Sequence, residues 1–144
     1  IIGNVTAALL ESLSTTSAAG AQTIGTVGAA ALKTLTTTSG AGAFILGNVS
    51  GAALETVSIT GGTGAVSVGT IDATSGLLTT ISIVDGAGAG AIGVGNIDAN
   101  SAKVSALTDV TITNAGTATT TVGTLAAGIN LNNYKPKQTS KLTL

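Results

Sequence analysis

The sequence contains no cysteine, histidine, methionine or tryptophan, and only a single proline. The absence of cysteine excludes disulfides and thiolate metal sites together. The fold must therefore be held by backbone hydrogen-bond ladders and apolar packing. Aromatic residues are almost absent too, since Phe44 and Tyr134 are the whole complement. A carbohydrate-binding site or a lyase cleft built on aromatic platforms is therefore disfavoured.

Charge is equally scarce. Charged residues make up 8% of the 144 residues and the formal net charge is −1, whereas charged residues are roughly 25% of ordinary soluble domains. The chain has no basic face for nucleic acid and little charge to keep copies apart. No apolar run approaches the roughly 20 residues that a membrane-spanning helix needs. We therefore expect no nucleic-acid partner, no membrane span, and a low self-repulsion that favours assembly.

A short phrase recurs along the chain: an apolar residue, glycine, asparagine or threonine, and a second apolar residue. Its glycines, here called the marker glycines, are Gly3, Gly25, Gly47, Gly69, Gly95 and Gly123. They are spaced 22, 22, 22, 26 and 28 residues apart. A constant period in the low twenties is typical of stacked repeats, in which each unit buries its apolar face against its neighbours. The longer spacings place extra residues in loops, where a stacked coil tolerates insertions best.

Between the marker glycines, apolar and hydroxyl residues alternate, as in Thr34–Thr38 and Thr56–Thr60. Period-two alternation rich in β-branched residues predicts a strand with one buried face. Four apolar residues hold the same place in these alternating runs and are predicted to form an inward ladder: Leu35, Val57, Ile81 and Val110.

These patterns predict an all-β fold, a right-handed β-solenoid (β-helix) of about six coils with about 22 residues per coil. A β-sandwich is the alternative, and the constant phase of the markers disfavours it. Residues 1–131 are expected to form the solenoid, and residues 132–144, here called the tail, a basic segment outside the repeat. The marker glycines are expected to stack tightly, so that Gly47→Val costs more than the same change at Gly62, which is expected to lie in a loose corner.

Acidic residues offer little chemistry. Glu11, Lys33 and Glu55 fall at the same position of successive coils, which predicts a ladder of alternating charge and not a pair of catalytic carboxylates. We expect no catalytic residue and no enzymatic activity.

Three further carboxylates, Asp72, Asp85 and Asp98, are expected in loops, where they could bind calcium. Asp72 and Asp98, in similar phrases one coil apart, are the weak candidates for such a site. An aspartate that bonds its own backbone in a turn is the alternative interpretation. No cofactor is expected besides this calcium.

Two Asn-x-Ser/Thr sequons begin at Asn4 and Asn48, at the same position of the coil. They are candidate glycosylation sites on one face. Threonine occupies this position at other markers, so a small outward polar residue is the alternative interpretation.

Serine and threonine also recur at the alternate, outward positions of the predicted strands. A regular threonine array on a β-solenoid looks like the ice-binding face of antifreeze proteins. Val84 and Asp109 interrupt the array. Ice binding is therefore kept as an alternative function.

Residues 53–61 and 78–83 resemble the β-strand repeats of prokaryotic surface-layer proteins and giant adhesins, and the resemblance extends over residues 2–125. It implies an extracellular, self-assembling surface protein without a fixed functional site. The function expected is a structural subunit of an extracellular filament, sheath or surface layer, or a repeat segment of a large adhesin. The chain itself is the expected partner, with cell-surface or matrix components beside it.

Assembly is expected at both ends of the solenoid. The chain opens at Ile1 and Ile2 without a polar cap and without a methionine, which suggests a processed or excised segment. Bare ends of solenoids stack, because their strand edges pair with other chains. The tail ends in an alternating segment, Leu142-Thr143-Leu144, which is expected to add to the edge of a neighbouring solenoid.

Overall fold

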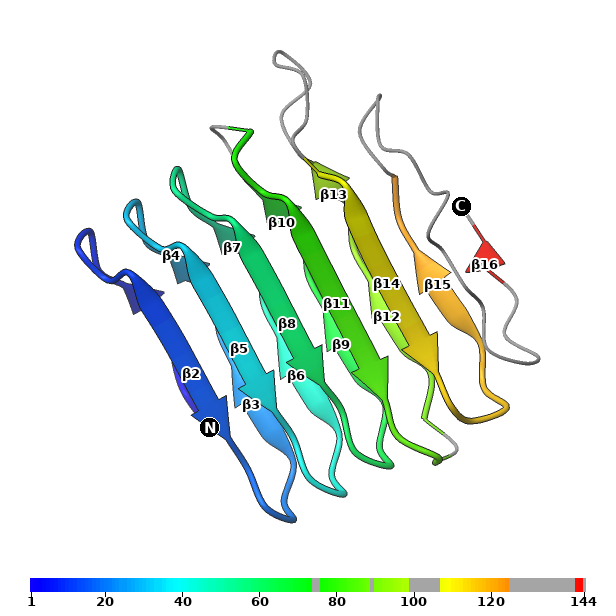
Figure 1. The fold of residues 1–144 in the computed structure, drawn as a ribbon. Helices are drawn as coiled ribbons and strands as arrows, with labels where there is room; N and C mark the ends of the chain where they lie inside the picture. Colours follow the sequence, from blue (N-terminus) through cyan, green and yellow to red (C-terminus); the bar gives the residue numbers. More distant parts are fainter. Residues whose placement is uncertain (74–75, 89, 99–106, 125–141, 144) are drawn as a thin grey trace.

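The computed structural model describes residues 1–73, 76–88, 90–98, 107–124 and 142–143, and within them the chain is all-β, without a helix (Figure 1). Each coil contributes three short strands, and strands of successive coils stack into three parallel sheets that run the length of the molecule. The fold is the predicted β-solenoid. No helix in the described ranges is long and apolar enough to cross a membrane.

The three sheets are named here by their place in the coil. The short sheet contains β1 (Val5–Thr6), β4 (Val27–Gly28), β7 (Val49–Ser50), β10 (Ile71–Asp72) and β13 (Ile97–Asp98). The long sheet contains β2 (Ser12–Thr16), β5 (Thr34–Thr38), β8 (Thr56–Thr60), β11 (Thr80–Asp85) and β14 (Asp109–Asn114). The return sheet contains β3 (Gln22–Ile24), β6 (Phe44–Leu46), β9 (Val66–Val68), β12 (Ile92–Val94), β15 (Thr120–Val122) and β16 (Leu142–Thr143).

The register follows the spacing of the marker glycines. Leu35 pairs with Val57, 22 residues on, while Ile71 pairs with Ile97 across the 26-residue interval. The additional residues therefore lie between strands, as predicted. In Figure 1 the chain descends through the long sheet at the front, returns behind it through the return sheet, and advances to the right with each coil, which makes the solenoid right-handed.

The number of coils differs slightly from the prediction. The short and long sheets contain five strands each, so the chain makes about four turns between the first and the last strand of each sheet, fewer than the six coils predicted. The sixth marker glycine, Gly123, introduces residues 125–141, which lie outside the described part of the chain.

The core is a set of apolar ladders between the sheets. The predicted ladder is confirmed: Leu35, Val57 and Ile81 are fully buried, and Val110 is 4% exposed. Successive members pair in register along the long sheet. A second ladder lies at the bend before each long strand and consists of Leu32, Leu54, Leu78 and Leu107.

Glycine is required wherever two coils approach closely. A Cβ added at Gly47 would lie 2.9 Å from the carbonyl carbon of Gly25 and from the amide nitrogen of Thr26, so the marker column is tight, as predicted. The prediction for Gly62 is wrong, because a Cβ there would overlap the carbonyl oxygen of Gly40 in the coil before. The corners after the long strands are therefore packed backbone on backbone.

Candidate functional site

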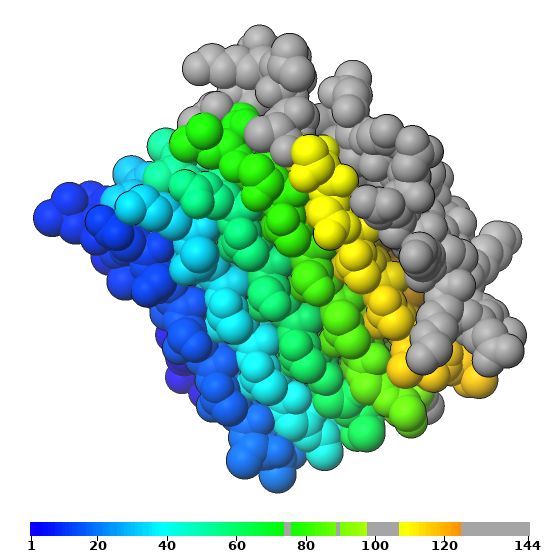
Figure 2. Space-filling view, in the orientation of Figure 1, coloured from blue at the N-terminus to red at the C-terminus, as the bar shows by residue number. Residues whose placement is uncertain are grey.

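The outward side of the long sheet is a regular array of hydroxyl groups, and Figure 2 shows this face. In-register pairing aligns the side chains in three columns: Ser12, Thr34, Thr56, Thr80 and Asp109; Ser14, Thr36, Ser58, Ser82 and Thr111; Thr16, Thr38, Thr60, Val84 and Thr113. Neighbouring strands lie about 4.8 Å apart and alternate residues of a strand about 7 Å apart. The hydroxyls therefore form a two-dimensional lattice, interrupted only at Val84 and Asp109, as the sequence predicts.

The first coil leaves its apolar side chains only partly covered. Leu10 and Leu13 are half-buried, whereas Leu32 and Leu35, at the same positions of the second coil, are fully buried. Leu9 is 89% exposed in the adjoining loop. β1 and β2 are the first strands of their sheets, so within the described residues each has a neighbour on one side only. This end of the solenoid combines an apolar surface with unpaired backbone groups.

The two residues predicted to start the assembly surface differ in their placement. Ile1 is fully exposed, but Ile2 forms a parallel bridge with Ile24 and so extends the return sheet beyond β3. The Ile2 N–H donates to the carbonyl oxygen of Thr23 at 2.7 Å, and the Gly25 N–H donates to the Ile2 carbonyl oxygen at 3.0 Å. Ile2 is therefore hydrogen-bonded into the return sheet.

The end of the tail lies on the solenoid of its own chain. Leu142 and Thr143 form β16, which pairs in parallel with Thr120 and Thr121 of β15. The predicted pairing of this segment with a neighbouring molecule stays a prediction, and Leu144 lies outside the described residues. A signal was present in the sequence, because Leu142-Thr143-Leu144 repeats the apolar–polar–apolar pattern of strands such as Val66–Val68.

The asparagines of the marker phrases link successive coils. The Oδ1 atom of Asn48 accepts a hydrogen bond from the backbone N–H of Thr70 at 2.9 Å, one coil further along. The Asn4–Thr26 and Asn96–Thr124 pairs repeat this geometry at 2.9 Å. Sequence reasoning treated Asn4 and Asn48 only as outward polar residues or glycosylation candidates. Their side-chain oxygens also clamp one coil to the next.

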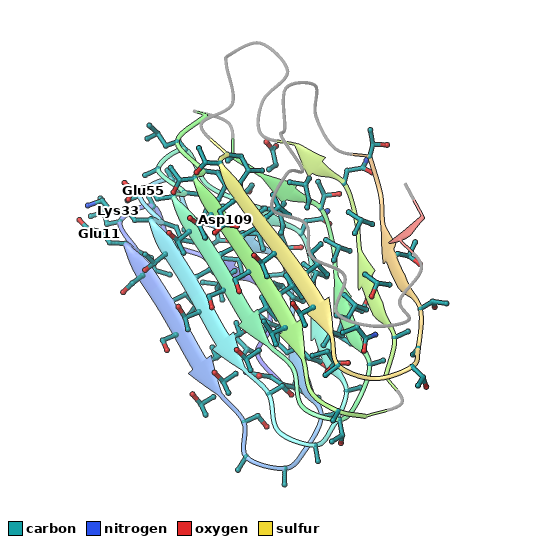
Figure 3. The ribbon with its side chains drawn as sticks, turned by 45° about the vertical axis from the view of Figure 1, so that its right-hand side comes forward. Glu11, Lys33, Glu55 and Asp109 are labelled. Carbon is teal, nitrogen blue, oxygen red and sulfur yellow. The ribbon has the colours of Figure 1, made fainter. Side chains whose placement is uncertain are left out.

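The charged ladder is present at the bend before the long strands. Figure 3 shows Glu11, Lys33 and Glu55 on successive coils along one edge. Lys33 Nζ lies 3.1 Å from Glu11 Oε2, and both side chains are largely exposed. An exposed ion pair of this kind contributes little to stability.

The aspartates considered for calcium are strand residues and do not lie in loops. Asp72 pairs with Asp98 across β10 and β13, so these two residues are adjacent, as their phrases predict. No group of three or more histidine, cysteine or acidic residues that could hold a metal ion occurs in the described part of the chain. The calcium hypothesis therefore has two acidic positions and no third ligand of this kind.

Asp85 carries a fully buried carboxylate. It ends β11 with its side chain directed inward, and its Oδ1 accepts a hydrogen bond from the Gly86 N–H at 2.9 Å. Its Oδ2 is buried without a partner. Burial raises the pKa of Asp85, and the Gly86 N–H opposes that rise.

Asn114 occupies the position of Asp85 in the next coil. Its Nδ2 donates to the carbonyl oxygens of Gly90 at 3.1 Å and Ala118 at 3.3 Å. Its Oδ1 accepts from the Gly116 N–H at 2.9 Å. Both polar atoms of the amide at this position therefore have hydrogen-bond partners, whereas one oxygen of the carboxylate of Asp85 has none.

The chain matches no protein-family model, no curated protein and no solved structure. The surfaces that could serve a function are therefore judged on their geometry: the open end of the first coil and the hydroxyl array of the long sheet.

Proposed function

We propose that the chain is a non-enzymatic structural subunit of an extracellular filament, sheath or surface layer, in which solenoids stack head to tail. One observation carries this proposal: the first coil leaves β1 and β2 with an unpaired edge and Leu10 and Leu13 half-exposed. Leu32 and Leu35, at the same positions of the second coil, are fully buried because the first coil covers them. A coil from a second molecule, stacked on the first coil, would bury Leu10 and Leu13 in the same way.

The energetics favour such stacking. Full burial of an exposed leucine or valine side chain stabilises by roughly 1.5–3 kcal/mol, and Val5, Leu10 and Leu13, which are partly buried already, can each gain a part of this on stacking. An unpaired parallel edge is a template for a further strand. The net charge of −1 gives little repulsion between copies.

Sedimentation velocity and negative-stain electron microscopy test the proposal. We expect the purified chain to form fast-sedimenting particles as its concentration rises, visible as rods of uniform width. Irregular aggregates, or a monomer at all concentrations, would contradict the proposed stacking.

The hydroxyl array supports a second candidate, ice binding. Thirteen of its fifteen positions carry a hydroxyl, and they lie in register on five parallel strands. A rigid lattice of this kind can order water over a surface. Unlike the filament, this function needs only a monomer.

Thermal hysteresis tests the second candidate. Ser58 lies at the centre of the array, so Ser58→Tyr should abolish hysteresis by lifting the ice surface away from its neighbours. Ser67→Tyr is the matched control, because Ser67 is exposed and outward on the return sheet. Absence of hysteresis in the unaltered protein, or equal hysteresis in both variants, would exclude ice binding through this face.

A further inference from the structure

The corner of the first coil, residues 17–21, differs from the later corners at one position. Each later corner contains a glycine at which a Cβ would overlap a carbonyl oxygen of the coil before: Gly40, Gly62, Gly86 and Gly116. The first coil carries an exposed alanine, Ala18, at the position of Gly40. The Cβ of Ala18 therefore stands where a preceding coil, stacked in the same way, would place its backbone.

The marker glycine of the first coil shows the opposite behaviour. Gly25 must be glycine, because a Cβ there would lie 3.0 Å from the carbonyl carbon of Gly3 in the coil before. At Gly3 itself a Cβ would meet nothing within 4 Å among the described residues. No contact within this part of the chain requires glycine at position 3, yet the position has the residue that a preceding coil would require. The marker side of the first coil can therefore accept a further coil without a clash.

The side chains divide the first coil in the same way, into a bend half (residues 2–14) and a corner half (residues 15–22). The inward positions of the bend half carry partly buried apolar side chains: Val5, Leu10 and Leu13. In the corner half, Gln22 Nε2 donates to Thr15 Oγ1 at 2.8 Å, and Ser17 Oγ donates to the Gly20 carbonyl oxygen at 3.2 Å. The bend half thus offers an apolar surface, whereas polar side chains of the corner half bond within their own coil.

We propose that a second copy of the chain stacks on the bend half of the first coil alone, and that Ala18 holds this copy away from the corner half. The inference rests on the proposed head-to-tail stacking and defines which part of the open edge takes part in it. Gly20 lies at the position of Gly42, where the next coil also approaches closely, and it is already glycine. Ala18→Gly should therefore be enough to let pairing extend over the whole coil.

Sedimentation velocity over a concentration series compares the unaltered chain with Ala18→Gly and Ala21→Gly. Ala21→Gly is the matched control, because alanine at this position recurs between stacked coils, as Ala43, Ala65 and Ala91. Ala18→Gly should lower the concentration at which fast-sedimenting particles appear by at least about fivefold, the effect of one additional backbone hydrogen bond between copies. Ala21→Gly should leave this concentration unchanged. Equal concentrations for all three proteins would overturn the inference and leave the stacking itself in place.

Gly3→Ala tests the bend half. The new Cβ meets no described residue of its own chain, so the unfolding midpoint of dilute protein should be unchanged or slightly raised. The concentration at which particles appear should rise by at least about fivefold, because the same Cβ would press on the backbone of a stacked copy. An unchanged concentration for Gly3→Ala, or irregular aggregates in place of uniform rods from Ala18→Gly, would overturn the inference. Particles from none of the four proteins would contradict the proposed function itself, and this inference with it.

Discussion

Asp85 and Asn114 occupy the same inward position in adjacent coils, and each accepts a 2.9 Å hydrogen bond from a following backbone N–H, that of Gly86 and that of Gly116. Only Asn114 also donates, through Nδ2 to the carbonyl oxygen of Gly90. An ionised Asp85 has no proton to donate, and its Oδ2 has no partner. The two positions thus compare a carboxylate with an amide in one environment.

This comparison predicts that Asp85→Asn stabilises the solenoid at neutral pH. The amide removes a buried negative charge and can donate as Asn114 does, for a gain of roughly 1–3 kcal/mol in the free energy of unfolding. Chemical denaturation at pH 7 measures the effect. Asp109→Asn is the control, because Asp109 lies on the outward face of the same sheet, and its effect should be small.

The same pair predicts a pH dependence. Burial raises the pKa of Asp85 above its ordinary value of 3.8, so the folded state holds the proton more tightly than the unfolded state. The stability that this proton contributes is fully present below pH 3.8 and is lost as the pH rises through the higher folded pKa. The advantage of Asp85→Asn should therefore grow with pH over this window. An advantage that shrinks as the pH rises would contradict the assignment of Asp85 as a buried, unsatisfied acid.

The inward ladder predicts that neighbouring residues of one strand differ strongly in their tolerance of a charged side chain. Val57→Asp places a charge in the core and should cost several kcal/mol, enough to abolish cooperative folding. Ser58→Asp puts the same charge on the outward side of β8 and should leave the fold intact. Circular dichroism and thermal unfolding of both variants test which residues of β8 point inward. A Val57→Asp variant that unfolds at the same temperature as the unaltered chain would contradict this assignment.

Marker glycines predict a contrast between two Gly→Ala changes. Gly47→Ala should destabilise by more than 1 kcal/mol, because the new Cβ would press on the backbone of the preceding coil. Gly93→Ala is the matched control within a strand, since a Cβ there meets nothing within 4 Å. Alanine also restricts the unfolded chain, so Gly93→Ala should be neutral or slightly stabilising. Equal unfolding midpoints for the two variants would contradict the close approach of successive coils at the marker glycines.

The asparagine clamp predicts that Asn48→Ala loses about 1 kcal/mol, the usual net worth of one hydrogen bond. Thr70→Ala should cost less, because the clamp uses the backbone N–H of Thr70 and not its hydroxyl. Denaturant titration of the two variants distinguishes them. A larger loss for Thr70→Ala would show that the side chain of that residue has the greater part in joining the coils.

The periodic features of the molecule could be predicted from the sequence. A fixed spacing of Gly25, Gly47 and Gly69 determines the register of every sheet, and the alternation in the long strands determines which residues point inward. The same alternation, continued from Ile81 and Ile83, places Asp85 inside, although the glycines after it suggest a loop.

Contacts between coils could not be predicted in this way. The tight corner at Gly62 depends on where the Gly40 carbonyl points, and that direction is a property of the stacked backbone. The clamp by Asn48 depends on where the backbone N–H of Thr70 points, one coil further along. β16 lies in the tail, whose composition departs from the repeat, so its apolar–polar–apolar pattern indicates a strand but the marker spacing does not indicate that this strand pairs with β15.

The central claim, stacking through the first coil, is tested most directly by blocking one edge. The Ser17 N–H donates a hydrogen bond to the carbonyl oxygen of Thr38 in the second coil, so it points toward β5. Successive N–H groups along a strand point to opposite sides. The Ser14 N–H, three residues earlier, therefore points away from β5, toward the open side of β2. Proline at position 14 would remove that donor and spare the ladder within the chain, since proline is tolerated on edge strands.

Negative-stain electron microscopy should then compare Ser14→Pro with Ser14→Ala, which keeps the N–H. We predict that both variants fold as β-rich proteins with cooperative unfolding, that Ser14→Ala forms rods, and that Ser14→Pro remains monomeric. Rods of unaltered length and abundance from folded Ser14→Pro protein would contradict stacking through this edge.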